Sequence, residues 1–150
     1  MKIPDLIRRL AALILLCGAA LAHAVDFVSV AEDGAILYDA PSLQAEKMFV
    51  VNRYTPFEQV VTLDNWVKVR DRSGSLYWVE KRVLSNQRYL VALPELLDVH
   101  TKPDLDAPLA FQVRQNVALE RLESTGTGWV KVRHRDGDTG YVRTTEVWGE

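Results

Sequence analysis

The sequence predicts an all-β protein made of two tandem small domains, each a partly open β-barrel, behind an N-terminal signal peptide helix. Three observations support this prediction: an apolar run near the N-terminus, an internal repeat, and short stretches in which apolar and polar residues alternate between glycine-containing turns. Hydrophobic residues make up 48% and charged residues 25% of the 150 residues, the balance of a globular chain that can bury a core.

Residues 1–24 have the three parts of a secretory signal peptide. Three basic residues (Lys2, Arg8 and Arg9) precede the apolar run 10–22, and Ala22-His23-Ala24 is a small-x-small cleavage site. The run is shorter than the roughly 20 apolar residues that a transmembrane helix needs. We therefore expect cleavage after Ala24 and a periplasmic protein.

Cys17 is the single cysteine of the chain and lies inside this run. A lipoprotein signal would place a small residue directly before the cysteine, whereas Leu16 stands there. Lipidation at Cys17 and an uncleaved anchor remain as alternatives, and they are the two ways in which we would expect membrane attachment. Cleavage removes the cysteine, so we expect no disulfide, no thiolate metal site and no cofactor.

The rest of the chain is an internal repeat. The segment 66–74 reads almost identically to 129–137, with an offset of 63 residues, and upstream the offset is 62. One extra residue within 126–128 explains the change. The repeat predicts two domains, over 26–86 and 87–150.

Each unit reads as a set of short strands. Val67 and Val69 alternate with polar side chains, which is the period of a half-buried strand. Turn residues around Gly74 and Gly137 predict hairpins. The expected strands cover 36–38, 57–63 and 66–70 in the first unit, and 96–99, 117–122 and 129–133 in the second. We expect the apolar segment 88–93 to join the two units and no helix after the signal.

Each unit resembles a bacterial SH3-like (SH3b) domain, and the whole resembles a signal-bearing tandem SH3 protein of Gram-negative bacteria. The resemblance lies in a Trp-Val-x-Val strand, a turn glycine and a Gly-Trp-Val strand, which appear here as 66–69, Gly74 and 78–79, and again as 129–132, Gly137 and 140–142. Two positions depart from the pattern. Tyr77 replaces the glycine, which we expect to remove a residue that accepts positive φ, and Tyr141 replaces the tryptophan. The resemblance implies a binding role around the cell wall or in protein contacts, without catalysis.

The sequence offers no set of catalytic groups. It has no Gly-x-Ser-x-Gly elbow and no phosphate-binding glycine loop. We interpret His100 as a half-exposed strand residue and His134 as the edge of an inward-facing row. The aspartates on both sides of Gly137 fit turn chemistry better than calcium binding. A formal net charge of −2 gives no case for nucleic acid.

Two candidate binding surfaces remain. The first is a duplicated row of one aromatic and three basic residues on one strand face, an arrangement that can hold an anionic ligand: Trp66, Lys68, Arg70, Arg72, and Trp129, Lys131, Arg133, Arg135. Such ligands include a peptidoglycan peptide, a lipopolysaccharide phosphate and an acidic protein. The alternative is an ordinary solvated strand face.

The second candidate surface is aromatic. It consists of side chains that border a groove or, alternatively, pack at the rim of the barrel: Tyr38, Tyr54, Tyr77 and Trp78 in the first unit, with Tyr141 and Trp148 in the second.

The sequence thus predicts a non-catalytic exported binding or scaffold protein that recognises peptidoglycan or an envelope protein. Two alternatives stay open: a targeting or regulatory subunit of a separately encoded cell-wall hydrolase, and a hydrolase in its own right. The identity of the ligand, the number of binding domains and the oligomeric state do not follow from the sequence.

Overall fold

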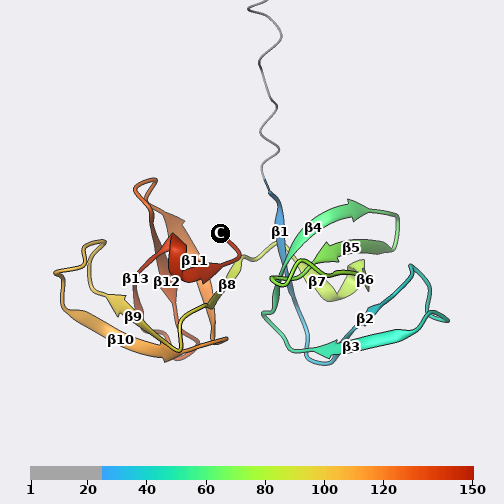
Figure 1. The fold of residues 1–150 in the computed structure, drawn as a ribbon, viewed down its shortest axis with the longest axis horizontal. Coiled ribbons are helices and arrows are strands. Elements are labelled where there is room, and N and C mark those ends of the chain that lie inside the picture. The colour runs from blue at the N-terminus through green and yellow to red at the C-terminus, as the bar shows by residue number, and fades with distance from the viewer. Residues whose placement is uncertain (1–24) are drawn as a thin grey trace, which may run out of the picture.

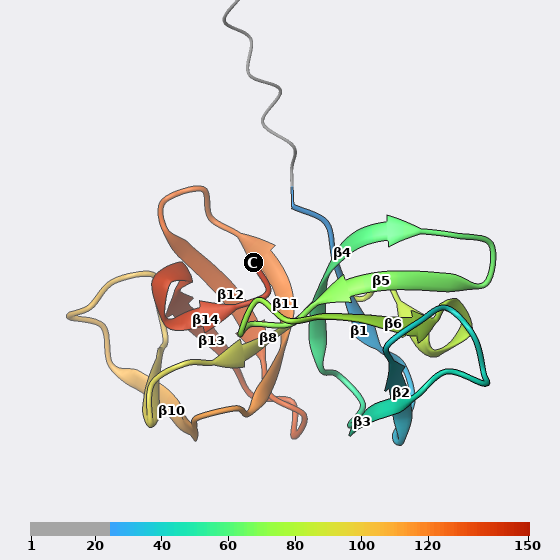
Figure 2. The same ribbon diagram turned by 45° about the vertical axis from the view of Figure 1, so that its right-hand side comes forward.

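The computed structural model describes residues 25–150, so the expected signal peptide and Cys17 lie outside the described residues. Fourteen strands and two short 3-10 helices form two antiparallel seven-stranded sheets, one from each half of the chain (Figure 1). A second view shows the sheets as two separate bodies side by side (Figure 2). Within residues 25–150, no helix is long and apolar enough to cross a membrane.

The first sheet has the strand order β3-β2-β6-β5-β4-β1-β7. Its elements are β1 (Phe27–Val30), β2 (Ala35–Tyr38), β3 (Lys47–Val51), β4 (Pro56–Thr62), β5 (Trp66–Arg70), β6 (Leu76–Glu80), the 3-10 helix η1 (Lys81–Val83) and β7 (Leu84–Ser85).

The second sheet repeats this order as β10-β9-β13-β12-β11-β8-β14. Its elements are β8 (Tyr89–Ala92), β9 (Leu96–His100), β10 (Leu109–Arg114), β11 (Ala118–Ser124), β12 (Trp129–Arg133), β13 (Thr139–Arg143), η2 (Thr144–Glu146) and β14 (Val147–Trp148). The repeat in sequence is therefore a repeat in topology. The predicted all-β fold of two tandem, partly open units is confirmed.

Alternating residues fill the core of each sheet. Val67, Val69 and Val79 are at most 2% exposed, and Val130 and Val132 are fully buried. The two valines of the Trp-Val-x-Val strand thus face inward in both units, as the alternation predicts. Burying each such side chain stabilises the fold by roughly 1.5–3 kcal/mol.

Six strands were not predicted, namely β1, β3, β7, β8, β10 and β14. β1, β3 and β10 lack a clear alternation of apolar and polar residues, because β1 is buried over most of its length and β3 is mainly exposed. The segment 88–93, expected to join the two units, is mostly the strand β8 of the second sheet, and its residues Arg88 and Tyr89 contact the first domain.

The repeat also preserves an uncommon backbone conformation. Tyr54 has a φ of 71° and Asn116, which lies 62 residues later, has a φ of 67°. These are the two non-glycine residues with positive φ in the described part of the chain. Both stand just before a strand, β4 or β11, so the same left-handed turn is built twice with different side chains.

The structure corrects the reason for a glycine in the Gly-Tyr-Val strand. Gly140 does not have positive φ. A Cβ at this position would lie 2.6 Å from Val99 Cγ1 and 2.7 Å from the His100 carbonyl oxygen, so the glycine provides space for β9. In the first unit Tyr77 occupies this position, and its ring packs edge-on against Phe49 with centroids 5.5 Å apart.

We predict that Gly140→Ala lowers the free energy of unfolding by about 1–3 kcal/mol, because the added methyl group overlaps β9. Urea denaturation of the purified protein measures this change. Thr139→Ala is the control, since Thr139 is the exposed neighbour on the same strand and should shift the transition little. Equal stability of the two variants would contradict the packing role of Gly140.

Candidate functional site

The two domains pack against each other through aromatic rings. Tyr54, just before β4, stacks on Tyr89 of β8 with ring centroids 4.2 Å apart and an interplanar angle of 27°. Phe27 of β1 meets Trp148 of β14 edge-on at 5.2 Å. The Tyr89 backbone N–H also donates to Ser29 Oγ over 3.2 Å. These contacts join the first sheet to the second and fix how the domains face each other.

Residues 149–150 close the same junction. Gly149 has a φ of 114°, and a Cβ there would lie 2.7 Å from the Tyr89 carbonyl oxygen and 3.2 Å from Pro56 Cβ. Arg88 donates to the Gly149 carbonyl oxygen over 2.5 Å and places its guanidinium 5.2 Å from the Phe27 ring centroid. Burial, followed by the charge of Arg121, lowers the pKa of Arg88.

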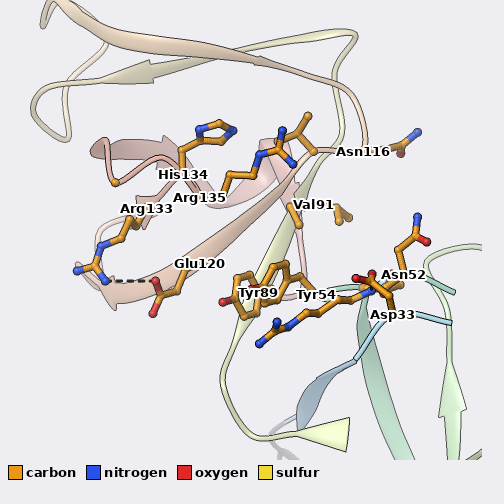
Figure 3. Close-up of a pocket in the computed structure, with 15 residues that line it drawn as sticks. Asp33, Asn52, Tyr54, Tyr89, Val91, Asn116, Glu120, Arg133, His134 and Arg135 are labelled. Atoms are coloured by element: carbon orange, nitrogen blue, oxygen red, sulfur yellow. Dashed lines mark hydrogen bonds and ion pairs between the residues drawn. The ribbon is translucent and has the colours of Figure 1, made fainter. Parts of the chain in front are cut away.

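A cleft of about 720 Å³ opens between the domains (Figure 3). Tyr54 and Tyr89 form its aromatic floor. The first domain contributes polar side chains from the turns around β2 and β4, and the second contributes them from β11 and the hairpin after β12. These polar residues are Asp33, Asn52, Arg53, Asn116, Glu120, Arg133, His134 and Arg135.

The carboxylates of the cleft already have partners within the protein. Glu120 accepts hydrogen bonds from Arg133 at 3.3 Å and from Gln87 at 2.9 Å. Asp33 accepts the backbone N–H of Arg53 over 2.9 Å. Among the described residues 25–150, Arg53 and Arg135 form no ion pair. The cleft therefore holds two guanidinium groups without an ion-pair partner in this range, beside the charged carboxylate of Asp33.

His134 lies at the rim of this cleft and is hydrogen-bonded through Nδ1 to the Asp136 carboxylate over 2.5 Å. This hydrogen bond lowers the pKa of Asp136 below its ordinary value. The Asp136 carboxylate therefore stabilises the turn at neutral pH, and this contribution is lost as the pH falls through the lowered pKa. The pair shapes the turn that carries Arg135.

The predicted basic rows do not form one open cationic face. Arg70 donates to both carboxylate oxygens of Glu58 at 2.8 Å, and Arg133 and Glu120 repeat this pair in the second domain. Arg72 donates to Asn116 Oδ1 over 2.6 Å and so bridges the domains. Exposed ion pairs of this kind contribute little stability, but they occupy the arginines.

The lysines of the rows lie against aromatic rings on the neighbouring strand. Lys68 Nζ is 5.7 Å from the Trp78 ring centroid, and Lys131 Nζ is 5.9 Å from that of Tyr141. Trp78 and Tyr141 are thus cation–π partners at equivalent places on β6 and β13.

Two expectations about exposure are corrected. Tyr38 is 3% exposed and packs edge-on against Trp66, with centroids 5.3 Å apart, so it does not border a groove. His100, expected to be half-exposed, is 9% exposed and packs in the same way on Trp129 at 5.7 Å. Its Nδ1 is 3.0 Å from the Ala107 carbonyl oxygen. Trp66 therefore covers Tyr38, the last residue of β2, and Trp129 covers His100, the last residue of β9.

A second groove of about 470 Å³ meets the cleft at Asn52 and Asn116. Tyr77 and Phe49 form its apolar wall, and Arg72 stands at its rim. Of the fourteen candidate residues of the two predicted surfaces, the structure therefore brings Tyr54, Arg133 and Arg135 to the cleft and Arg72, Tyr77 and Trp148 to the groove. Trp66 borders a separate shallow hollow beside η1.

The sequence did not identify Arg53, Tyr89 or Asn116 as site residues. One signal was available, because the 62-residue offset of the repeat aligns Asn116 with the candidate residue Tyr54. Among residues 25–150, no group of three or more His, Cys, Asp or Glu side chains is placed to hold a metal ion.

Comparison with known families identifies the class of protein. Residues 31–86 and residues 95–147 each match a family model described as a bacterial SH3 domain, by two related models. Together the matches span more than two thirds of the chain and fall one on each sheet. The protein belongs to the bacterial SH3 domain family and carries two copies of the domain.

A search of curated proteins gives no match. Among solved structures, the chain is similar to NlpC1 and NlpC2 from Trichomonas vaginalis, both at 14% identity and a TM-score of 0.39, covering 91% and 85% of this chain and 50% and 49% of theirs. An NlpC/P60 family protein from Bacillus cereus ATCC 10987 is similar at 12% identity and a TM-score of 0.35, covering 81% of this chain and 55% of that one. The chain thus spans about half the length of these proteins.

The Tyr54–Tyr89 stack makes Tyr89 a reporter of the domain interface. Burial, with a further contribution from Tyr54, raises the pKa of Tyr89 above its ordinary value of 10.0. The stability that depends on the neutral phenol is therefore present below that value and is lost as the pH rises through the raised pKa. We predict that Tyr54→Ala lowers the Tyr89 pKa toward 10.0, as measured by NMR titration of ring-labelled tyrosine.

Tyr141→Ala is the matched control for this titration, because Tyr141 lies on β13 and is not among the residues that shift Tyr89. An unchanged Tyr89 pKa in Tyr54→Ala would contradict the contact between the domains.

Proposed function

We propose that this protein is a non-catalytic, exported binding module of the bacterial envelope and that it holds peptidoglycan in the cleft between its two SH3 domains. The observation that carries the proposal is the cleft itself, which has an aromatic floor and arginines from both domains. Concave sites between domains, with a few convergent polar groups, are the usual location of ligands.

The chemistry of peptidoglycan suits this cleft. Its peptides present carboxylates and amides, and its sugars present apolar faces. The half-buried tyrosine rings offer apolar contact for such faces, arginines pair with carboxylates, and the side chains of Asn52 and Asn116 match amide groups. Membership of the bacterial SH3 domain family supports a binding role. The expected signal peptide supports export to the periplasm.

An envelope protein is the second candidate partner, and β3 favours it. This strand ends the first sheet, and Met48, Phe49 and Val50 are 41%, 54% and 71% exposed on it. A free strand edge with apolar side chains can pair with a strand of another protein. If the partner is an envelope protein, the chain would act as a scaffold or as a targeting subunit of a separate cell-wall hydrolase.

The test is retention of the purified protein on insoluble peptidoglycan sacculi at low and at moderate salt. We predict retention that weakens as salt rises, because exposed arginine contacts are screened. The same incubation reports turnover, and we expect no release of soluble fragments.

Failure to bind at both salt concentrations would overturn the peptidoglycan proposal and favour the envelope protein, which cross-linking in cells then identifies. Release of fragments by the purified protein would contradict a non-catalytic role.

A further inference from the structure

We propose that the cleft recognises a peptide through its C-terminal carboxylate group, which Arg53 of the first domain and Arg135 of the second bind together beside the Tyr54–Tyr89 stack. This inference rests on the proposed peptidoglycan-binding role and assigns the chemistry of its site. Recognition then needs both domains, because each one supplies a guanidinium and one ring of the stack.

Arg53 is positioned by the left-handed turn before β4. Its backbone N–H is held by Asp33 over 2.9 Å, and its guanidinium carbon lies 4.9 Å from the Tyr54 ring centroid. A guanidinium that rests on a ring face keeps its N–H donors pointing outward in its own plane. Arg53 is thus oriented by the protein and still able to form two parallel hydrogen bonds with a carboxylate.

Arg135 approaches the cleft from the other domain. It follows β12 in the hairpin that the His134–Asp136 hydrogen bond closes, and it is exposed. Figure 3 shows Arg135 and His134 on one side of the opening, with Tyr54 and Asn52 on the other. Arg53, the neighbour of both Asn52 and Tyr54 in the chain, and Arg135 line the same cleft without an ion-pair partner among residues 25–150, whereas Arg70 and Arg133 of the basic rows are occupied by glutamates.

The other groups of the cleft favour a peptide carboxylate over a phosphate. Asp33 and Glu120 also line it, so three arginines stand against two carboxylates and the excess positive charge is small. A single carboxylate matches that excess better than a phosphate dianion, which the acidic groups would repel. Asn52 and Asn116 add amide donors and acceptors that suit a peptide backbone.

The test is calorimetric titration of the purified protein with a soluble disaccharide-tripeptide fragment of peptidoglycan. The comparison ligand is the same fragment with its C-terminal carboxylate converted to an amide. We predict that the amide binds roughly tenfold more weakly, which corresponds to about 1.4 kcal/mol, because it loses a charge-assisted hydrogen bond.

Arg53→Gln and Arg135→Gln should each weaken binding of the free acid and reduce its preference over the amide, and the double variant should abolish that preference. Lys102→Gln is the matched control, because Lys102 is an exposed cation in the loop between β9 and β10 and is absent from the cleft lining. All three side chains are exposed or half-exposed, and NMR spectra of the variants check that the fold is retained.

Equal affinity for acid and amide, or no binding of either by a protein that sacculi retain, would overturn this inference and leave the proposed function standing. Displacement of the fragment by equimolar inorganic phosphate would also overturn it, because the site would then select a phosphate. If sacculi do not retain the unmodified protein, the proposed function is overturned instead, so the two failures are distinguishable.

Discussion

The stacking of Tyr54 on Tyr89 is the contact on which the rest of the site depends. Each domain has about 60 residues, a size at which a single core is marginal and the chain benefits from a further packed surface. The stack and the Phe27–Trp148 contact supply that surface between the two sheets. Because the same rings form the floor of the cleft, the interaction that joins the domains also shapes the place where a ligand can bind.

The internal repeat explains how one scaffold yields an asymmetric site. Strand order, inner valines, the Arg–Glu pair and the outer tryptophan contact are all present twice. The units differ at the junction, where Tyr54 corresponds to Asn116 and Tyr89 corresponds to Phe27. The duplicated backbone therefore places these side chains at equivalent positions in the two units. Because the side chains themselves differ, one face of each domain packs specifically against the other domain.

Much of the fold could be predicted from the sequence, because a period of two residues reports directly which side chains face the core. The same pattern does not report what covers the outer face. Tyr38 and His100 are buried there by a tryptophan from the adjoining part of the sheet, and a strand pattern carries no information about that partner. The cleft could not be predicted for a related reason. Arg53 and Arg135 lie 82 residues apart in sequence, and they share a site only through the relative orientation of two domains.

The proposed binding site depends most on a fixed orientation of the two domains. Residual dipolar couplings of the backbone amides, measured by NMR on the partly aligned protein without ligand, test it directly. A fixed junction predicts that both domains fit one alignment tensor with the arrangement in Figure 1. Two tensors of different magnitude would mean that the domains reorient independently, and this would contradict a cleft formed before the ligand binds.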